Sequence, residues 1–474
     1  MLVKDRQFYK TFITLGAAIA VQNLLAFGVN LADNMMLGRY SETSIAAASL
    51  INQIQYLLQM VSVNGIGTGA LALVSQYWGK GDIEPIRRII ALMAKFAMAT
   101  GILFFALSFF CTRTVVGLMT NQPAVLEEGA IYLRLMSFTY IAFPLQSSLV
   151  MAMRGTHTVK IGPFISAVAL VINIVLNYVF IYGNWGAPEM GIRGAAVATI
   201  VSRVIELIIT LVYVRLVDKK LRLRLLSFFR PDFLYLGDFA RAALPVIGSA
   251  ASWGLGTIMQ TVILGHITET VIAANSIAVV VHQVLTVYSF GATWASGVMI
   301  GNVVGGGKLE LVRPYTRTLQ LLYVANGLIT SLVLFLIRDA VLDFYILTPE
   351  TRQLARRFLT VLCVTVVGSS YLFPVESGII LGGGNTRYAV IVDTLFMWLW
   401  VIPASALSAF VFGFPPLVTF IMIKSDQLLK AIPNAIVVNR YGWIRNLTRE
   451  TGHNVAGKAE AGQSTAVSDQ RAER

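Results

Sequence analysis

One carboxylate is singled out by its position in the chain. Asp33 lies about five residues before the end of a long apolar segment, within the polar run Asn30-Leu31-Ala32-Asp33-Asn34. Inserting a charged side chain at the centre of a membrane-spanning helix costs roughly 2.5–3.5 kcal/mol. A buried acid is therefore expected to have a bonding partner or a functional role. Such a group could take up a proton or hold a cation. Alternatively, Asp33 lies near enough to the membrane interface to be hydrated.

Two amides on a second apolar segment could complete a site around this acid. Asn173 and Asn177 are four residues apart, so they share one face of a helix. They could hydrogen-bond a neighbouring helix and serve packing alone. Alternatively, they lie beside Asp33 together with Thr199 of the following segment and form a cation-coupling site with it.

Further charges lie in other apolar segments. Glu376 could be a second coupling residue, or it could bond to a neighbouring polar group. Glu206 lies one turn from Arg203, which favours a local ion pair. A polar stripe in the last apolar segment is interpreted as mostly structural and consists of Lys424, Asp426 and Lys430.

The composition indicates the elements that must carry these residues. Of 474 residues, 56% are apolar and 13% charged, against about 25% charged in average soluble domains. Many apolar stretches exceed the roughly 20 residues that cross a bilayer as a helix. We expect an all-α integral membrane protein with about twelve transmembrane helices. They are predicted near 11–38, 45–77, 90–112, 130–153, 161–183, 192–217, 239–266, 271–304, 315–338, 357–382, 388–413 and 415–438.

The positive charges indicate the orientation in the membrane. The net charge is +13, but the Lys and Arg residues gather on alternate loops, as cytoplasmic loops do, so nucleic acid is not the expected partner. We therefore expect a multi-pass protein of the cytoplasmic membrane with both termini in the cytoplasm. The apolar run after Lys4, Arg6 and Lys10 is too long for a cleavable signal. Cys111 falls at an outer helix end and Cys363 within a span, so no disulfide between them is expected. The four histidines lack the spacing of a metal site.

The chain repeats itself at an offset of about 227 residues. Three ordered matches pair Leu37–Ser49 with Leu264–Ser276, Gly79–Glu84 with Gly305–Glu310, and Arg154–Thr158 with Gly382–Thr386. Two halves of six spans each give a parallel repeat with a substrate path between the halves. We predict six-helix bundles at 1–217 and 239–444, a cytoplasmic linker at 218–238 and a disordered tail at 445–474. Asp33 corresponds to Gln260, so only one half carries the acid.

These features together resemble the multidrug and toxic compound extrusion (MATE) family. The resemblance rests on the runs Ala32–Arg39, Asn173–Gly183 and Gly191–Thr199, and on their doubled order. It implies two six-helix bundles arranged in a V, alternating access, and efflux coupled to protons or sodium. It also implies that no cofactor is needed beyond the coupling ion.

Two departures from the family qualify the coupling site. In the DinF-like branch an Asn and an Asp take the positions of Asn173 and Asn177, so this chain holds one carboxylate fewer. Where the NorM-like branch has acids in its C-terminal half, this chain has Ala250 and Tyr371. A sodium site of that type is therefore poorly supported, and a proton is the expected coupling ion.

The expected substrates are small organic solutes, cationic or amphiphilic, moved by a monomer. An apolar cavity with few polar groups suits them. Its candidate lining residues are Met35, Gln55, Gln146, Gln260 and Tyr140, each of which could equally be plain packing.

Other functions are less well supported. A flippase for a lipid-linked saccharide or peptide precursor would need several basic residues in its cavity, whereas the intramembrane positives are few: Lys95, Arg134 and Arg203. An enzyme is not expected, because the chain has no HExxH and no Ser/His/Asp constellation, and it lacks the GxxxxGK[ST] loop of ATP-binding proteins.

Overall fold

Helices make up all the regular structure in the computed structural model, which describes residues 2–120, 122–223, 228, 230, 232–343, 345 and 347–449. The first half contains α1 (Arg6–Tyr40), α2 (Glu42–Gln59), α3 (Thr68–Lys80), α4 (Ile83–Phe110), α5 (Thr112–Gly117), α6 (Pro123–Met136), α7 (Thr139–Gly155), α8 (Ile161–Tyr182) and α9 (Ile192–Val212). Short turns of other helix types are η1 (Met60–Gly67), which joins α2 to α3, η2 (Asn184–Gly186), and η3 (Tyr213–Val217), which extends α9.

The second half is more often interrupted. It contains α10 (Leu236–Gly265), α11 (Glu269–Gly305), α12 (Val312–Asp343), α13 (Pro349–Phe373), α14 (Thr386–Phe396), α15 (Ile402–Ala406), α16 (Pro416–Lys424), α17 (Asp426–Leu429) and α18 (Ala431–Arg440). Between them lie η5 (Leu309–Leu311), η6 (Pro374–Ile380), η7 (Met397–Val401) and η8 (Leu407–Val411).

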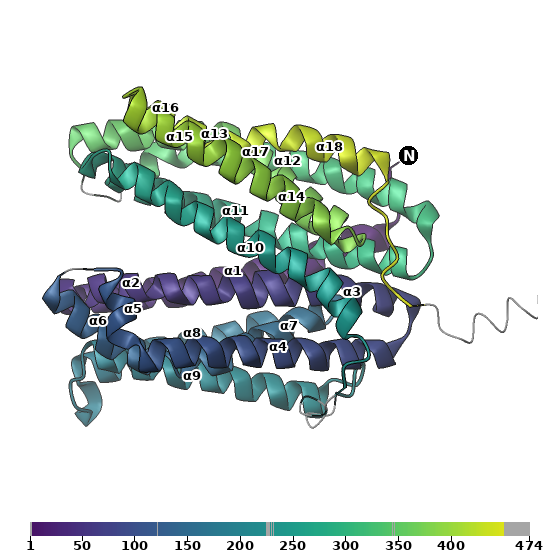
Figure 1. Cartoon of the computed structure of the whole chain (residues 1–474), viewed down its shortest axis with the longest axis horizontal. Coiled ribbons are helices and arrows are strands. Elements are labelled where there is room, and N and C mark those ends of the chain that lie inside the picture. Colours follow the sequence, from purple (N-terminus) through teal and green to yellow (C-terminus); the bar gives the residue numbers. More distant parts are fainter. Residues whose placement is uncertain are drawn as a thin grey trace, which may run out of the picture.

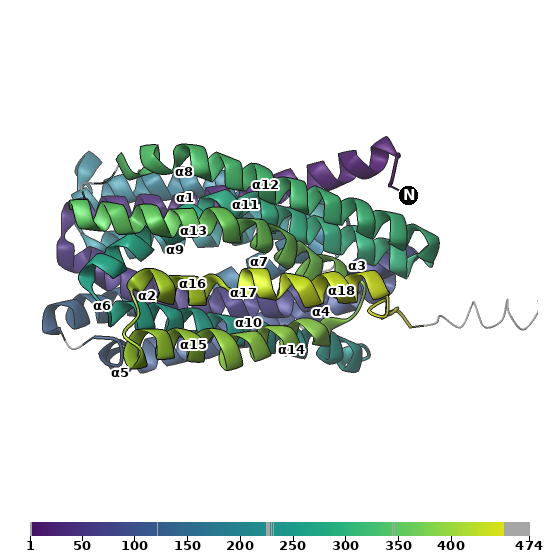
Figure 2. The same ribbon diagram turned by 90° about the horizontal axis from the view of Figure 1, so that it is seen from above.

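The predicted spans agree with these helices, with one difference in their number. In the described part of the chain, ten helices are long and apolar enough to cross a membrane, or eleven when α6 and α7, bent by 51°, count as one. The twelfth predicted span, 415–438, is divided into α16, α17 and α18, which follow one another along one side of the molecule (Figure 2). The divisions fall at Ser425 and Lys430, which both keep right-handed helical backbone angles, so the three pieces run on from one another.

The repeat seen in the sequence has a structural counterpart in two helix caps. Ser41 precedes α2 with an extended backbone, and its side chain accepts a hydrogen bond from the backbone N–H of Ser44 at 3.4 Å. Thr268 precedes α11 in the same way and accepts from Val271 at 3.3 Å. Hydroxyl side chains at this position satisfy an N–H that the helix leaves unpaired. The two copies therefore begin equivalent helices by the same interaction.

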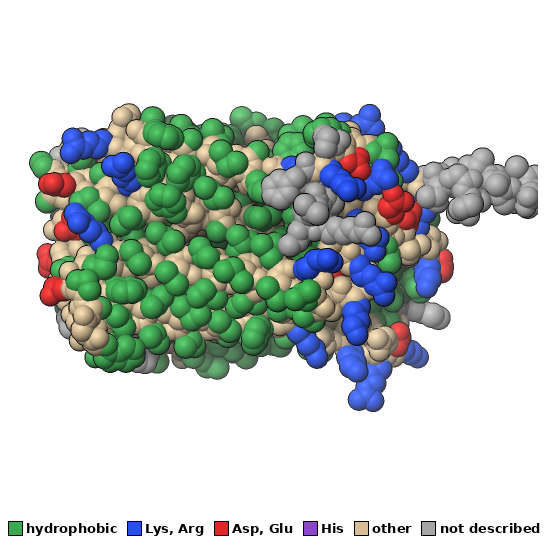
Figure 3. Space-filling view, turned by 90° about the horizontal axis from the view of Figure 1, so that it is seen from below, with side chains coloured by type: hydrophobic (Ala, Val, Ile, Leu, Met, Phe, Trp, Pro, Cys, Tyr) green, Lys and Arg blue, Asp and Glu red, His purple; other side chains and the backbone are tan. Residues whose placement is uncertain are grey.

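The two halves form two layers that meet at one end of the molecule (Figure 1). There Gly79 packs against the carbonyl of Asn302, and Gly305 packs against the carbonyl of Gln76, with no room for a Cβ at either glycine. These are corresponding positions of the repeat, so the contact is nearly symmetrical. Lys and Arg side chains gather at this end, and a broad apolar belt covers the middle of the visible face (Figure 3). We call the end of the molecule where these Lys and Arg side chains gather the basic end.

The first residues after the last helix contact both halves. The N–H of Arg445 donates to the carbonyl of Gly383 at 2.7 Å, and that of Leu447 donates to Oε1 of Gln76 at 2.6 Å. Arg449 Nε donates to Asp238 Oδ2 at 2.6 Å. Residues 445–449 therefore pack across both halves, whereas the rest of the predicted disordered tail, 450–474, lies outside the described residues, as does part of the predicted linker.

Candidate functional site

Asp33 lies inside the first half, surrounded by amides. Its side chain is 8% exposed, and those of Asn173 and Asn177 are fully buried. Nδ2 of Asn177 donates to Oδ1 of Asp33 at 2.5 Å and to Oδ1 of Asn173 at 3.1 Å. Nδ2 of Asn173 in turn donates to Thr199 Oγ1 at 3.4 Å. The structure thus brings these four residues together, and we call them the N-terminal carboxylate site.

Helix periodicity explains this arrangement. The helix α8 packs against both α1 and α9. Asn173 and Asn177 are one turn apart on α8, so both amides face the same neighbours. One of them reaches Asp33 on α1 and the other reaches Thr199 on α9. A buried hydrogen-bonded chain of this kind satisfies polar groups that lipid could not satisfy.

The carboxylate of Asp33 has no cationic partner among the described residues. Arg203 lies one turn beyond Thr199, but its Nη1 is bound to Glu206 Oε2 at 2.8 Å, as the sequence predicts, and its guanidinium lies over the ring of Phe143. Neutral amide donors therefore hold the carboxylate. One amide oxygen of this site, Asn177 Oδ1, is buried without a described partner.

A second group of charges lies inside the other half. The ammonium of Lys430 is 2.9 Å from Oδ1 of Asp393 and 3.2 Å from Oδ2 of Asp426. Nδ2 of Asn434, one turn beyond Lys430, donates to Oε2 of Glu376 at 3.0 Å. We call these five residues the C-terminal charge cluster. It holds three acids and one base, so one base cannot neutralise all three carboxylates if they are ionised.

This cluster gives the polar stripe of the last segment partners in another segment as well as in its own. Lys430 is only 2% exposed, and it binds residues from two different segments. Asp393 was not singled out from the sequence, although an acid in an apolar segment calls for a partner. Ser249, which adjoins Ala250, donates to Oδ2 of Asp393 at 2.8 Å. The acids of this half thus lie at positions other than those expected from the family.

The predicted substrate-contacting residues are spread over both halves. Met35 is 55% exposed and lies about 200° around α1 from Asp33. Tyr140 is fully buried in the core of the first half, as packing alone would explain. Gln146 on α7 is buried and Gln55 on α2 is half-buried. Gln260 on α10 donates from Nε2 to the sulfur of Met397 at 3.3 Å. Their contact with substrate stays a prediction.

Comparison with known proteins gives the same two-part organisation. The family model described as MatE matches residues 18–179 and again residues 245–407. A probable multidrug resistance protein NorM of Thermotoga maritima is 24% identical over 425 residues, which cover 88% of this chain and 86% of that protein. The uncharacterized transporter YisQ of Bacillus subtilis is 23% identical over 85% of this chain and 88% of its own length.

Solved structures show the same fold. A MATE transporter of Vibrio cholerae, VcmN, superimposes with a TM-score of 0.84 at 16% identity, covering 93% of this chain and 98% of that one. A transporter of the MOP superfamily from Pyrococcus furiosus gives 0.83 at 17% identity, covering 95% and 100%. A model of one repeat that matches twice along the chain confirms the internal duplication inferred from the sequence.

Proposed function

Since this chain belongs to the MATE family of multi-pass membrane transporters, we propose that it expels small organic solutes in exchange for a cation, with a proton as the coupling ion. The observation that carries this proposal is the carboxylate of Asp33, which is 8% exposed and held by amides without a cationic partner among the described residues. A buried acid of this kind is available for a mobile positive charge.

The chemistry around Asp33 favours a proton over sodium. The amide group that contacts Asp33 presents an N–H donor, not an oxygen ligand. Hard metal cations are bound by about six or more oxygen atoms. This site offers one carboxylate, the Oδ1 of Asn177 that has no described partner, and the hydroxyl of Thr199. A proton needs only one carboxylate oxygen. We extend the proposal to Glu376, whose Oε1 is buried without a described partner, as a second residue that takes up a proton.

Coupling requires that proton and substrate oppose each other's binding. A proton that enters from outside neutralises Asp33, substrate leaves, and the two halves rock so that the other end opens. Allosteric couplings of this kind are typically 1–3 kcal/mol. The close packing of Gly79 and Gly305 at the basic end supports a state in which that end is closed. We assign the basic end to the cytoplasm, because cytoplasmic loops are rich in Lys and Arg.

Cationic or amphiphilic solutes suit these sites better than anionic headgroups do. A flippase for a lipid-linked precursor would need free basic residues between the halves. The buried bases instead have protein partners: Arg203 binds Glu206, Lys430 binds Asp393, and Arg154 binds Gln22. We therefore rank the flippase second, and we propose that the transporter acts as a monomer in the cytoplasmic membrane.

The test is transport by Asp33→Asn in proteoliposomes with an imposed pH gradient. Export of a fluorescent amphiphilic cation and the accompanying proton release are measured together. Loss of a coupling of 1–3 kcal/mol corresponds to about 5–150-fold slower pH-driven export. Asp339→Asn, which removes a half-exposed acid of α12, is the matched control and should transport normally. Undiminished pH-driven export by Asp33→Asn would contradict the mechanism. Export by the wild-type protein that is driven by a sodium gradient alone would show that sodium, and not the proton, is the coupling ion.

A further inference from the structure

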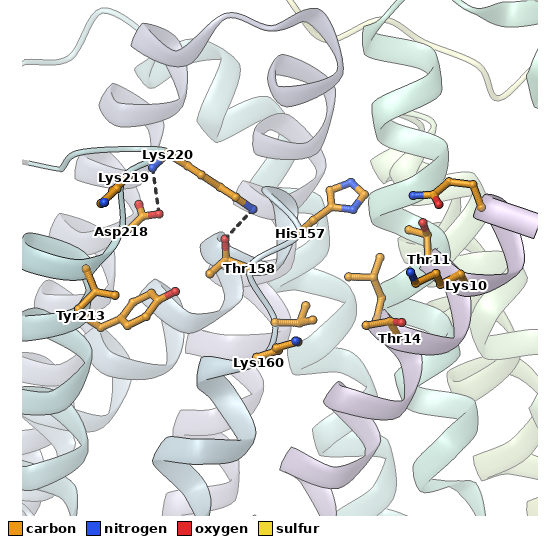
Figure 4. A pocket seen from close by; sticks show the side chains of 14 residues that line it. Lys10, Thr11, Thr14, His157, Thr158, Lys160, Tyr213, Asp218, Lys219 and Lys220 are labelled. Atoms are coloured by element: carbon orange, nitrogen blue, oxygen red, sulfur yellow. Dashed lines mark hydrogen bonds between the residues drawn. The ribbon is translucent and has the colours of Figure 1, made fainter.

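A cavity of about 510 Å³ opens at the basic end of the first half. Its walls come from the first turns of α1, from the turn between α7 and α8, and from the segment after α9 (Figure 4). Four lysines line it: Lys10, Lys160, Lys219 and Lys220. All four are exposed to solvent, which distinguishes them from the buried bases described above. We call this cavity the lysine pocket.

The charge of the lysine pocket is unbalanced. Asp218 is the one acid of its lining, and both of its oxygens accept backbone hydrogen bonds, from Lys220 at 3.3 Å and Leu221 at 3.0 Å. The ammonium of Lys220 donates to the carbonyl of Thr156 at 2.8 Å and to Thr158 Oγ1 at 3.2 Å. Within the described residues, none of the four lysines forms an ion pair. Like charges around one cavity repel each other unless an anion lies between them.

Neutral groups in the lysine pocket suit an oxyanion. The hydroxyl-bearing residues Thr11, Thr14 and Tyr213 line it as possible hydrogen-bond donors. Burial lowers the pKa of His157 from its ordinary 6.5, and the charge of Lys220 lowers it further. The ring is therefore neutral at neutral pH, and the positive charge of the pocket comes from its lysines alone.

The surroundings of the pocket favour a ligand with an apolar part. Val217 lines the cavity and is 55% exposed, and the adjoining Leu216 is 74% exposed. Apolar side chains exposed next to basic ones at the end of a membrane-spanning helix are typical of the region where lipid headgroups meet acyl chains. A soluble anion would gain nothing from these two residues, whereas the first carbons of an acyl chain would.

We infer that the lysine pocket binds the phosphate-bearing headgroup of an anionic membrane lipid. The phosphate lies between Lys10 and Lys160, with Lys219 adding positive charge from the opposite wall (Figure 4), and the acyl chains run along Leu216 and Val217 toward the apolar belt. Basic pockets between membrane helices are suited to such headgroups. This inference depends on neither the coupling ion nor the transported substrate.

The position of Lys10 gives such a lipid a structural consequence. The start of α1 packs on the second half, where Phe8 meets the ring of Tyr315 and the N–H of Val3 donates to Thr318 Oγ1 at 3.0 Å. Lys160 and Lys219 belong to the first half. A headgroup that contacts both sides of the pocket therefore links α1, anchored on the second half, to the body of the first half.

The experiment is native mass spectrometry of the full-length protein released from nanodiscs made of equal parts phosphatidylcholine and phosphatidylglycerol. The wild-type protein should retain phosphatidylglycerol at least about tenfold more than phosphatidylcholine, since each basic residue near a membrane surface contributes about fivefold. The combined variant Lys10→Gln, Lys160→Gln, Lys219→Gln should lose most of this preference. The charge-preserving variant Lys10→Arg, Lys160→Arg, Lys219→Arg should keep it, and it tests the pocket even if the Gln variant folds poorly.

The matched control removes three positive charges elsewhere on the molecule, by Lys4→Gln, Lys308→Gln and Arg387→Gln. If it lost phosphatidylglycerol as fully as the pocket variant, the attraction would be a general surface effect and the inference would be wrong. The inference would equally be wrong if the pocket variant retained the lipid unchanged. Displacement of the lipid by sn-glycerol 3-phosphate at equal concentration would identify a soluble phosphate ester as the ligand, and would overturn the assignment to lipid.

Discussion

The two halves share a backbone plan but hold their buried charges differently. In the N-terminal carboxylate site a single acid, Asp33, is held by neutral amides. In the C-terminal charge cluster two acids, Asp393 and Asp426, bind Lys430, and a third, Glu376, accepts a hydrogen bond from Asn434. The last helix of the first half also carries a base, the half-buried Arg203. In the first half that base is bound by Glu206, one turn away on its own helix, which leaves Asp33 without a cation.

This difference separates a site that can exchange a charge from one that is fixed by ion pairs. Removing one partner of a buried ion pair leaves an uncompensated charge and costs about 3–5 kcal/mol. A buried acid held by amides carries no such partner, and its neutralisation costs much less. The duplication therefore kept the helices, while the changes in charged residues gave the halves unequal tasks. We expect proton exchange at Asp33 to dominate in the first half, and the ion pairs of Lys430 to hold the second half together beside Glu376.

The largest expected effect comes from removing the base of the C-terminal charge cluster. Lys430→Met should lower the free energy of unfolding by about 3–5 kcal/mol, because Asp393 and Asp426 lose their shared counter-charge inside the bundle. The measurement is reversible unfolding of the purified protein in mixed micelles. The double variant Lys430→Met, Asp393→Asn should lose less than the two single losses added together, because the residues are in contact. Additive losses would mean that the pair does not act as a unit.

A smaller effect is expected at one acid of the same cluster. Asp393→Asn should cost about 1.5–3 kcal/mol, the range for a hydrogen bond to a charged group. Lys430 keeps Asp426 at 3.2 Å, and the amide still offers an oxygen to either Lys430 or Ser249. Ser249→Ala, which removes the other contact of Asp393, serves as the matched control and should cost about 1 kcal/mol. A loss equal to that of Lys430→Met would show that Asp393 alone, and not the pair of acids, compensates the base.

The sequence predicts the first of these sites better than the second for a physical reason. Asn173 and Asn177 lie one turn apart on one helix, so helix periodicity puts both amides on one face. Their place beside Asp33 is what the resemblance to the MATE family implies. The contact of Lys430 with Asp393 joins segments 37 residues apart. It depends on how the interrupted helices α14 and α16–α18 pack, and neither hydrophobicity nor spacing determines that packing.

A signal for the second site was nevertheless present in the sequence. Asp393 is the one charge between Arg387 and Lys424, and it needs a partner inside a membrane. The neighbouring apolar segment offers the bases Lys424 and Lys430. This cost alone would have justified pairing Asp393 with a base of that segment. The lysine pocket could not be found in the same way, because Lys10, Lys160 and Lys219 come from three loops or helix ends that only the fold brings around one cavity.

The smallest expected effect on stability belongs to the residue with the largest expected effect on transport. Asp33→Asn should change the free energy of unfolding by no more than about 1 kcal/mol, because the new amide retains an oxygen that accepts from Asn177 and because no buried cation loses its partner. Asp33→Leu, which removes the acceptor as well as the charge, is the contrasting variant and should cost about 1–3 kcal/mol more through the unsatisfied amide of Asn177. Unfolding in the same micelles compares all these variants directly. A loss in Asp33→Asn as large as that in Lys430→Met would mean that Asp33 has an ionic partner after all. The first half would then be a structural cluster like the second, and the separation of proton exchange from cohesion would be lost.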